Sequence, residues 1–144
     1  MNNVKQILKS KGYRIVDVSI DATVLEALKQ MAENHIGSVI VMDGDKIAGI
    51  FTERDFAHKV GVLDVSPSTI RVSDVMTRGL ITVGLEATVN ECMEIVTENK
   101  VRHLPVIDGD HIVGVVSIGD IVKDMIDELQ FVVKQLENYI TYFR

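Results

Sequence analysis

The chain has 144 residues, of which 47% are hydrophobic and 25% are charged, and its formal net charge is −6. This length fits one compact domain or two small units that share a core. No cluster of Lys and Arg supplies the basic face that nucleic acid or an anionic membrane surface needs, so neither is expected as a partner. A small anionic ligand is still compatible, because it needs only one or two local cations and some backbone N–H groups.

Cysteine usage and the N-terminal segment indicate the compartment. The single cysteine, Cys92, excludes an internal disulfide framework and suits a reducing environment. It falls within a predicted amphipathic helix, which favours a buried structural thiol. The N-terminus has no apolar signal core, and no apolar run approaches the roughly 20 residues of a membrane-spanning helix. We therefore expect a soluble, cytoplasmic protein.

The first elements of the chain build a compact supersecondary unit. After a short helix over residues 3–10, Thr23 and Glu26 form a capping box, in which hydroxyl and carboxylate satisfy reciprocal backbone donors at a helix start. An Asp-Gly-Asp turn then joins two strands into an antiparallel hairpin. In order, the unit contains a strand (14–18), the capped helix, two hairpin strands (39–42 and 46–51) and a second helix from Arg54.

The same unit recurs 65 residues later without a gap, because residues 18–55 align with residues 83–120. Its strands are expected at 80–83, 104–107 and 111–116. Each copy is a β-α-β-β-α unit whose strand–helix–strand part gives two parallel strands. The predicted fold class is therefore α/β in the mixed α+β sense. One copy of about 50 residues is too small to fold alone, so we expect the two copies to pack sheet against sheet.

The domain organisation follows from this repeat, with an amphipathic helix at the C-terminal end. Residues 118–142 are expected to form nearly continuous helix with an apolar stripe. We expect this stripe to contact a second chain, with packing on its own domain as the alternative. The stripe contains Ile126, Leu129, Val133, Leu136, Ile140 and Phe143. The predicted divisions are an N-terminal helix (1–13), the first copy (14–62), a linker (63–72), the second copy (73–126) and a C-terminal helix (127–144).

Each copy has the same strand-to-helix corner. The first reads GIFTERD and contains Thr52 and Asp55, and the second reads GVVSIGD and contains Ser117 and Asp120. A carboxylate accepts two hydrogen bonds at once, and a ribose offers two adjacent hydroxyls. A hydroxyl beside a helix N-terminus is well placed for phosphate. The alternative is that hydroxyl and carboxylate only cap the helix.

These residues resemble a known family. The duplicated GxxTxxD/GxxSxxD corner, the β-α-β-β-α unit, Asp-Val-Met-Thr at 74–77 and Arg-His-Leu-Pro-Val at 102–106 are similar to a tandem pair of CBS (cystathionine-β-synthase) motifs, called a Bateman module. The resemblance covers residues from about 14 to 126. It implies a regulatory module that binds adenosine nucleotides in clefts between paired sheets. It also implies dimerisation into a flat disc of four motifs and an output in trans on a target protein.

The resemblance also implies roles for particular residues. Asp55 and Asp120 would hold the ribose diol, while Thr52 and Ser117 would reach a phosphate. The residues around His-x-Pro would lie near phosphates, although the sequence leaves open which cleft Arg102 serves. The candidate ligand contacts are the two corners (Thr52, Glu53, Arg54, Asp55, Ser117, Ile118, Asp120), the walls of an adenine slot (Val18, Ser38, Thr82, Val83), the segment Arg102, His103 and Pro105, and Met76 as a purine cap or as ordinary packing.

The two clefts are not expected to be equivalent. Arg54 in the first corner has Gly119 as its counterpart, whereas Arg102-His103 replaces Gly37-Ser38 of the first copy. The copies have thus exchanged their basic groups, which predicts two classes of site or one occupied site per chain. The alternative is that both arginines are solvated surface charges.

Catalytic and metal chemistry are not expected. The four histidines lack metal-ligand spacing, and one cysteine cannot build a structural zinc site. No Ser-His-Asp order or glycine-rich phosphate loop is present. The sequence therefore predicts a non-enzymatic homodimer that binds AMP, ADP or ATP as an energy or metabolite sensor, without an obligatory cofactor. The alternatives are a scaffold with vestigial clefts, or a binder of S-adenosylmethionine or NAD.

Overall fold

In the computed structural model, which describes residues 2–143, the chain divides into two compact units. One unit is the continuous segment 14–81, and the other combines residues 2–13 with residues 82–143. Both are mixed α+β units with a small sheet and covering helices, so the predicted fold class is confirmed.

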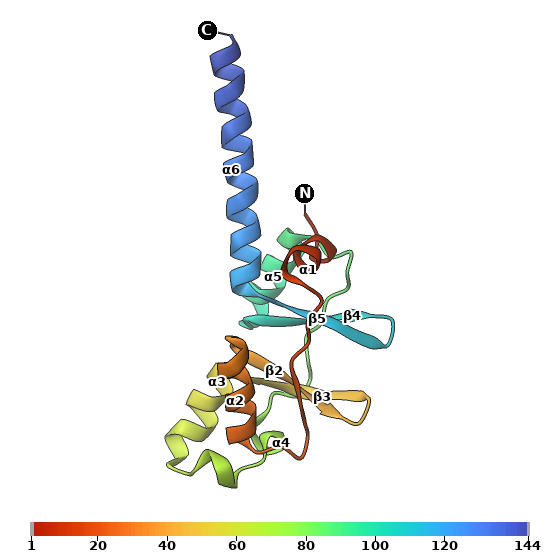
Figure 1. Cartoon of the computed structure of the whole chain (residues 1–144), viewed down its shortest axis with the longest axis vertical. Helices are drawn as coiled ribbons and strands as arrows, with labels where there is room; N and C mark the ends of the chain where they lie inside the picture. Colours follow the sequence, from red (N-terminus) through yellow and green to blue (C-terminus); the bar gives the residue numbers. More distant parts are fainter. Residues whose placement is uncertain (1, 144) are drawn as a thin grey trace. The chain divides into compact units, whose positions relative to one another are not determined.

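The unit of residues 14–81 contains a three-stranded sheet in the order β1-β2-β3, of which the β2–β3 hairpin is labelled in Figure 1. β1 pairs with β2 in parallel, and β2 pairs with β3 in an antiparallel hairpin, as the sequence predicts. A π-helical turn over residues 56–60 follows the corner helix α3. The elements are β1 (Asp17–Ser19), α2 (Val24–Asn34), β2 (Ser38–Asp43), β3 (Lys46–Thr52), α3 (Glu53–Asp55) and α4 (Val72–Val75).

The second unit repeats this plan around the antiparallel hairpin of β4 and β5. Its first strand is shorter than predicted. Of the expected strand at 80–83, only Val83 pairs, in a parallel bridge to Val106. The N–H of Val83 donates to the carbonyl of Pro105 at 3.1 Å, and its carbonyl accepts from the N–H of Ile107 at 2.9 Å. The first copy differs from the prediction in the same way, since β1 begins at Asp17 and not at residue 14. The elements are α1 (Val4–Lys11), α5 (Val89–Asn99), β4 (His103–Asp108), β5 (His111–Ser117) and α6 (Ile118–Tyr142).

The two short helices α1 and α4 are exchanged between the copies: α1 packs on the second copy, and α4 packs on the first. The N–H of Val4 in α1 donates to the carbonyl of Ala87 at 2.9 Å, and the N–H of Val72 in α4 donates to the carbonyl of Ala22 at 2.8 Å. Ala22 and Ala87 are equivalent positions of the repeat, so the two contacts are counterparts. The N-terminal helix is therefore part of the core of the second copy, where Leu8 is fully buried.

The long helix α6 has the length that its sequence predicts. Its N-terminal residue, Ile118, follows β5 directly, and its C-terminal turn stands well away from α1 and α5 (Figure 1). Ile121 is the only fully buried residue that the structure describes in this helix. No helix within residues 2–143 combines the length and apolar character needed to cross a membrane.

A glycine at the same place in each hairpin makes room for α1 and for α4 with the residues up to Thr77. We call these two stretches the exchanged segments, because each packs on the copy that it does not precede. A Cβ at Gly49 would lie 2.6 Å from the carbonyl oxygen of Thr77, and a Cβ at Gly114 would lie 2.8 Å from a methyl group of Leu8. The Thr77 carbonyl accepts from the N–H of Ile50 at 3.0 Å, so it cannot move away from Gly49 without shifting the strand bridge between Ile50 and Thr77. The obstacle at Gly114 is instead the end of a flexible side chain.

We expect Gly49→Ala to lower the free energy of unfolding by about 1–3 kcal/mol, the usual cost of overpacking a core. Gly114→Ala should cost less, because Leu8 can change rotamer. Gly84→Ala is the matched control, since its Cβ would meet open space, and should change stability by less than about 0.5 kcal/mol. Urea unfolding of the three variants measures the order. Equal losses at Gly49 and Gly114 would contradict this account of the packing.

Candidate functional site

The first corner is a fully formed helix cap. β3 ends at Thr52, whose hydroxyl accepts a hydrogen bond from the N–H of Asp55 at 3.1 Å. In return, Oδ2 of Asp55 accepts hydrogen bonds from the N–H of Thr52 at 3.0 Å and from its hydroxyl at 3.2 Å. The capping alternative considered from the sequence therefore describes the geometry of this corner.

The other oxygen of Asp55 is also occupied. Oδ1 accepts a hydrogen bond from the Thr77 hydroxyl at 2.9 Å and forms an ion pair with Lys59 at 3.0 Å. Asp55 is only 6% exposed. A carboxylate offers about four acceptor sites, so these partners nearly exhaust the hydrogen-bonding capacity of Asp55. A ribose diol could bind here only by displacing Thr77, Lys59 or both.

The second corner has the same cap but a more accessible carboxylate. The Ser117 hydroxyl accepts from the N–H of Asp120 at 3.1 Å, and the N–H of Ser117 donates to Oδ2 of Asp120 at 2.8 Å. The Asp120 side chain is 22% exposed, compared with 7% for Asp55. Asp120 lies in the first turn of α6, a helix of 25 residues, whose N-terminus favours negative charge.

The cation at the second corner comes from the N-terminal helix. Lys11 of α1 contacts Oδ2 of Asp120 at 2.6 Å and donates a second hydrogen bond to the carbonyl of Val115 at 2.8 Å. In the first corner the cation is local, because Lys59 lies four residues after Asp55. The equivalent position in the second copy is Asp124, so that copy has a carboxylate where the first has Lys59. Lys11 fills this role from 109 positions away.

Opposing effects set the pKa of Asp120. Burial alone would raise the pKa of this carboxyl. The hydrogen bond from Lys11, the N–H of Ser117, the positive charge of Lys11 and the Ser117 hydroxyl together outweigh burial and hold the pKa below its ordinary value of 3.8. The carboxylate is therefore fully ionised at neutral pH, which is the form that accepts hydrogen bonds from a diol.

The remaining candidate residues fall around these two corners. In the unit of residues 14–81, buried Ser38 pairs across the hairpin with Thr52, and buried Met76 packs beside Gly49 next to Thr77. Glu53 and Arg54 are exposed in α3, and Val18 lines a shallow surface groove between β1 and α2. This groove is bordered by Asp17, Asp21 and Glu26, so it is acidic and unsuited to phosphate.

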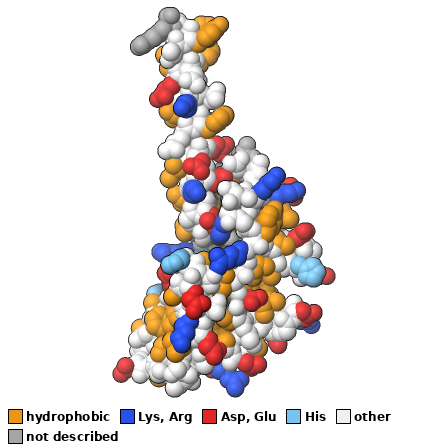
Figure 2. All heavy atoms as spheres, in the orientation of Figure 1, with side chains coloured by type: hydrophobic (Ala, Val, Ile, Leu, Met, Phe, Trp, Pro, Cys, Tyr) orange, Lys and Arg blue, Asp and Glu red, His pale blue; other side chains and the backbone are white. Residues whose placement is uncertain are grey.

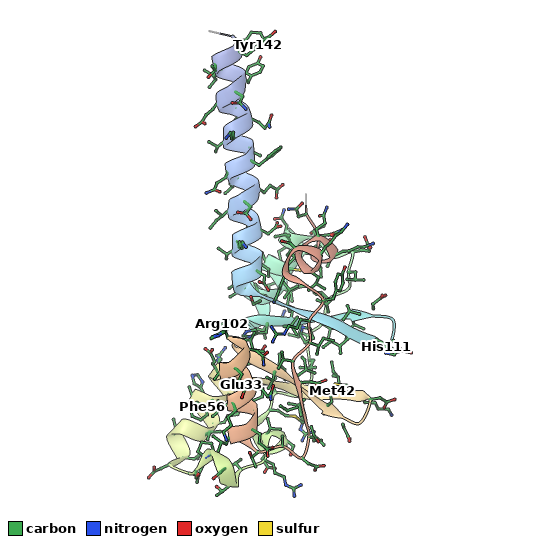
Figure 3. The ribbon with its side chains drawn as sticks, viewed as in Figure 1. Glu33, Met42, Phe56, Arg102, His111 and Tyr142 are labelled. Atoms are coloured by element: carbon green, nitrogen blue, oxygen red, sulfur yellow. The ribbon has the colours of Figure 1, made fainter. Side chains whose placement is uncertain are left out.

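In the other unit, the candidate residues gather near Ser117. His103 pairs with Ser117 across the hairpin, and the carbonyl of exposed Arg102 accepts from the N–H of Ile118 at 2.9 Å. Arg102 lies where the chain enters β4 (Figure 3). Pro105 is buried and its carbonyl accepts from the N–H of Val83, while Thr82 is exposed. Backbone pairing thus brings five predicted residues to the second corner: Arg102, His103, Ser117, Ile118 and Asp120.

Sequence reasoning missed three side chains that contact the corner carboxylates. Lys11 and Thr77 lie in the exchanged segments, far from their partners in the chain, so no short-range spacing indicates them. Lys59 could have been found, because a lysine four residues after Asp55 is an ordinary helical pair. Within the described residues no three His, Cys, Asp or Glu side chains gather as a metal site.

Comparison with known proteins gives one consistent family. The model of the CBS domain matches this chain twice, over residues 4–61 and 72–127. The mitochondrial CBS domain-containing protein CBSX3 of Arabidopsis thaliana is 36% identical over 147 residues, which cover 95% of this chain and 71% of that protein. Both matched segments begin at the exchanged helices α1 and α4.

Solved structures agree with this result. A CBS-domain protein from Burkholderia ambifaria is 44% identical with a TM-score of 0.84, covering 88% of this chain and 95% of that one. A hexameric CBS-CP12 protein from bloom-forming cyanobacteria is 29% identical with a TM-score of 0.75, covering 84% of this chain and 70% of that one.

The lowered pKa of Asp120 predicts an acid-sensitive contribution to stability. This contribution is complete above the unfolded-state value of about 3.9 and is lost as the pH falls through the lower folded-state value. We expect Asp120→Asn to lower the free energy of unfolding at pH 7 by about 1 kcal/mol, because Lys11 is 38% exposed and water screens the pair. The difference from the unmodified chain should shrink below about pH 4.

Urea unfolding between pH 2 and pH 7 checks this, with Lys11→Met as the matched variant. Lys11→Met should show a similar loss at pH 7, and the double variant should lose little more. A difference that stayed constant over the whole pH range would contradict the pairing of Lys11 with Asp120.

Proposed function

The chain belongs to the CBS domain family as a tandem pair, and we propose that it is a regulatory module that binds an adenine nucleotide at its second corner. AMP, ADP and ATP are the proposed ligands, and the output is a ligand-dependent change transmitted to another protein. The chain itself is proposed not to be an enzyme. A reducing compartment, with the cytoplasm as the expected location, fits the single buried Cys92, whose thiol pKa is raised by burial and by Glu91.

One observation carries this proposal. At the second corner an ionised, partly exposed carboxylate, the Ser117 hydroxyl and the Lys11 ammonium meet at the N-terminus of a 25-residue helix. The carboxylate suits a ribose diol, and the ammonium and the helix N-terminus suit phosphate. A nucleoside phosphate presents these two kinds of group a short distance apart, so one ligand can satisfy both.

The first corner supports an unequal use of the two copies. Asp55 is buried and accepts hydrogen bonds from Thr52 and Thr77 as well as the ion pair with Lys59. Displacing these partners would leave buried polar groups unsatisfied, which opposes binding. We therefore propose that Asp55 mainly stabilises its unit and that the second corner is the higher-affinity site.

A scaffold without a ligand is the second candidate, and the same internal saturation of Asp55 favours it. Titration calorimetry against AMP, ADP, ATP, NAD and S-adenosylmethionine distinguishes the candidates. Binding of one of the three nucleotides with a preference over NAD and S-adenosylmethionine supports the sensor. Tighter binding of either of those two would change the ligand class. No heat with any ligand up to millimolar concentration would favour the scaffold.

Self-association is also proposed. The four-motif disc implied by the family needs two chains, and the hexameric CBS-CP12 relative shows that a protein with this fold can assemble into an oligomer. A homodimer that acts on a separate target protein is the simplest assembly consistent with the four-motif disc and with self-association.

The ribose assignment predicts unequal effects of two aspartate variants. We expect Asp120→Ala to weaken AMP binding by about 1.5–3 kcal/mol, roughly tenfold to 150-fold, because a hydrogen bond to a charged group is lost. Asp55→Asn should leave the affinity within about threefold. Calorimetry with AMP and with 2′-deoxy-AMP measures both effects. Equal binding of the deoxy ligand, or a larger loss at Asp55, would show that Asp120 does not hold the diol.

Lys11 should distinguish ligands by their phosphates. In the ligand-free chain Lys11 neutralises Asp120, whereas a bound phosphate would offer it a second partner. We expect Lys11→Met to lower the ratio of ATP affinity to adenosine affinity by about tenfold, as expected for one lost charge-assisted hydrogen bond. Lys9→Met on the same helix is the control. An unchanged ratio would mean that Lys11 does not reach the phosphates.

A further inference from the structure

The C-terminal part of α6 exposes a large apolar surface to solvent. From residue 126 onward the described helix and its cap carry ten large apolar side chains that are between 47% and 81% exposed: Ile126, Leu129, Phe131, Val132, Val133, Leu136, Tyr139, Ile140, Tyr142 and Phe143. Side chains project from this part of the helix with no other element beside them, up to the labelled Tyr142 (Figure 3). Hydrophobic atoms are visible along this part of the helix, among charged and other atoms (Figure 2).

The apolar side chains follow a seven-residue repeat. One seam alternates spacings of four and three over the whole helix: Ile118, Val122, Met125, Leu129, Val132, Leu136, Tyr139 and Phe143. A flanking row recurs every seven residues: Ile126, Val133 and Ile140. A seam sustained over more than three heptads is typical of a helix that packs lengthwise on another helix.

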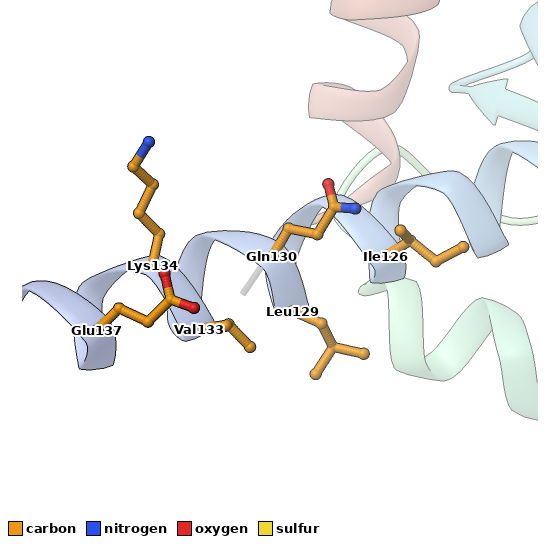
Figure 4. A pocket seen from close by; sticks show the side chains of 6 residues that line it. All are labelled: Ile126, Leu129, Gln130, Val133, Lys134 and Glu137. Carbon is orange, nitrogen blue, oxygen red and sulfur yellow. The ribbon is translucent and has the colours of Figure 1, made fainter.

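A groove lies beside the flanking row and is lined by Ile126, Leu129, Gln130, Val133, Lys134 and Glu137 (Figure 4). These residues are spaced by three or four positions, so they are neighbours on one side of the helix. Ile126 and Val133 of the flanking row border the groove, so the packing surface extends to the flanking side of the seam.

We propose that the occupant of this face is α6 of a second copy of the chain, aligned antiparallel. The seam reads the same in both directions, because its spacings of four and three alternate symmetrically about the midpoint between residues 130 and 131. Antiparallel alignment about this midpoint places every seam residue opposite another: Ile118 opposite Phe143, Val122 opposite Tyr139, Met125 opposite Leu136, and Leu129 opposite Val132 of the second copy.

The flanking row selects this orientation over a parallel one. In a parallel pair, the row of Ile126, Val133 and Ile140 would face the other flank of the seam, which contains Glu128 and Gln135. In an antiparallel pair the row faces itself, so that Ile126 of one copy lies within two residues of the level of Val133 of the second copy. The antiparallel pair therefore buries apolar side chains against each other and leaves the polar flank in solvent.

The charges beside the flanking row are complementary in the same alignment. Lys123 precedes Ile126 by three residues, and Glu137 precedes Ile140 by three residues. Antiparallel pairing brings Lys123 of one copy to the level of Glu137 of the other, twice by symmetry. At 1.5 Å per residue α6 is about 37 Å long, and a stable interface needs roughly 800 Å² per partner. A seam and flanking row of this length can supply such an area.

Disulfide trapping tests the orientation in a Cys92→Ala background. Met125→Cys combined with Leu136→Cys should form intermolecular disulfides under mild oxidation, because Met125 of each copy lies opposite Leu136 of the other. Val122→Cys should not, because the two copies of residue 122 are 17 residues, or about 25 Å, apart along the paired helices. Adding Tyr139→Cys to Val122→Cys should restore the crosslink. A disulfide from Val122→Cys alone would indicate a parallel pair and would overturn the proposal.

Sedimentation velocity tests whether α6 holds the copies together. Leu129→Glu should raise the dimer dissociation constant at least tenfold, while Gln130→Glu, the neighbouring polar control, should change it less than threefold. Residue 129 is 64% exposed, so neither variant should unfold its unit. Urea unfolding of both variants checks this. An unmodified chain that is monomeric at tens of micromolar, or a dimer that Leu129→Glu leaves intact, would overturn the proposal. Either result is independent of nucleotide binding.

Discussion

At each corner a hydroxyl accepts from the backbone N–H of the aspartate three residues later, and the aspartate carboxylate accepts from the backbone N–H of the hydroxyl residue. These reciprocal bonds determine how each copy is built. They end β3 at Thr52 and β5 at Ser117, and they start the next helix at the following residue. Each cap orients its carboxylate, because one oxygen is held by the backbone N–H of the hydroxyl residue. The same two side chains therefore shape the fold and present the groups that a nucleotide would need. Capping and ligand binding are compatible uses of one geometry.

What distinguishes the two corners is the origin of the neighbouring partners. Each corner carboxylate is neutralised by one lysine, but Lys59 belongs to the same helical segment as Asp55, whereas Lys11 arrives on a segment exchanged between the copies. Thr77 reaches Asp55 by the corresponding exchange. The repeat is thus symmetric in its backbone and asymmetric in its side chains. That asymmetry leaves Asp120 more accessible than Asp55, although both carboxylates have similar caps.

The sequence predicts local structure well and non-local contacts poorly, for a physical reason. Capping boxes, the Asp-Gly-Asp turns and the helical stripe depend on residues within four positions of one another, so both hairpins and the helix Ile118–Tyr142 were predicted closely. Most of the strand at 80–83 did not form, because pairing with β4 is a contact between residues far apart in the chain, which local sequence does not specify. Lys11 could not be assigned to Asp120, since nothing in a spacing of 109 residues indicates contact.

The contacts of α1 offer a route by which the second corner could influence α6. Two polar contacts join α1 and the residue before its cap to the first two turns of α6: Lys11 with Asp120, and the Asn2 amide with Oδ1 of Asp124 at 2.9 Å. Oδ2 of Asp124 is buried without a hydrogen-bond partner among the described residues, so this end of α6 is incompletely satisfied. A ligand that took over Asp120 would remove one of the two contacts and leave the weaker one.

Such a ligand can change association through α6 only if it binds the two arrangements of α1 and α6 with different affinity. The coupling would then be reciprocal, and pairing of α6 would change nucleotide affinity by the same factor. Leu8 remains fully buried under Gly114 and anchors α1 to the hairpin. The change is therefore expected to be confined to the C-terminal turn of α1 and the first turns of α6, rather than to involve release of the whole helix.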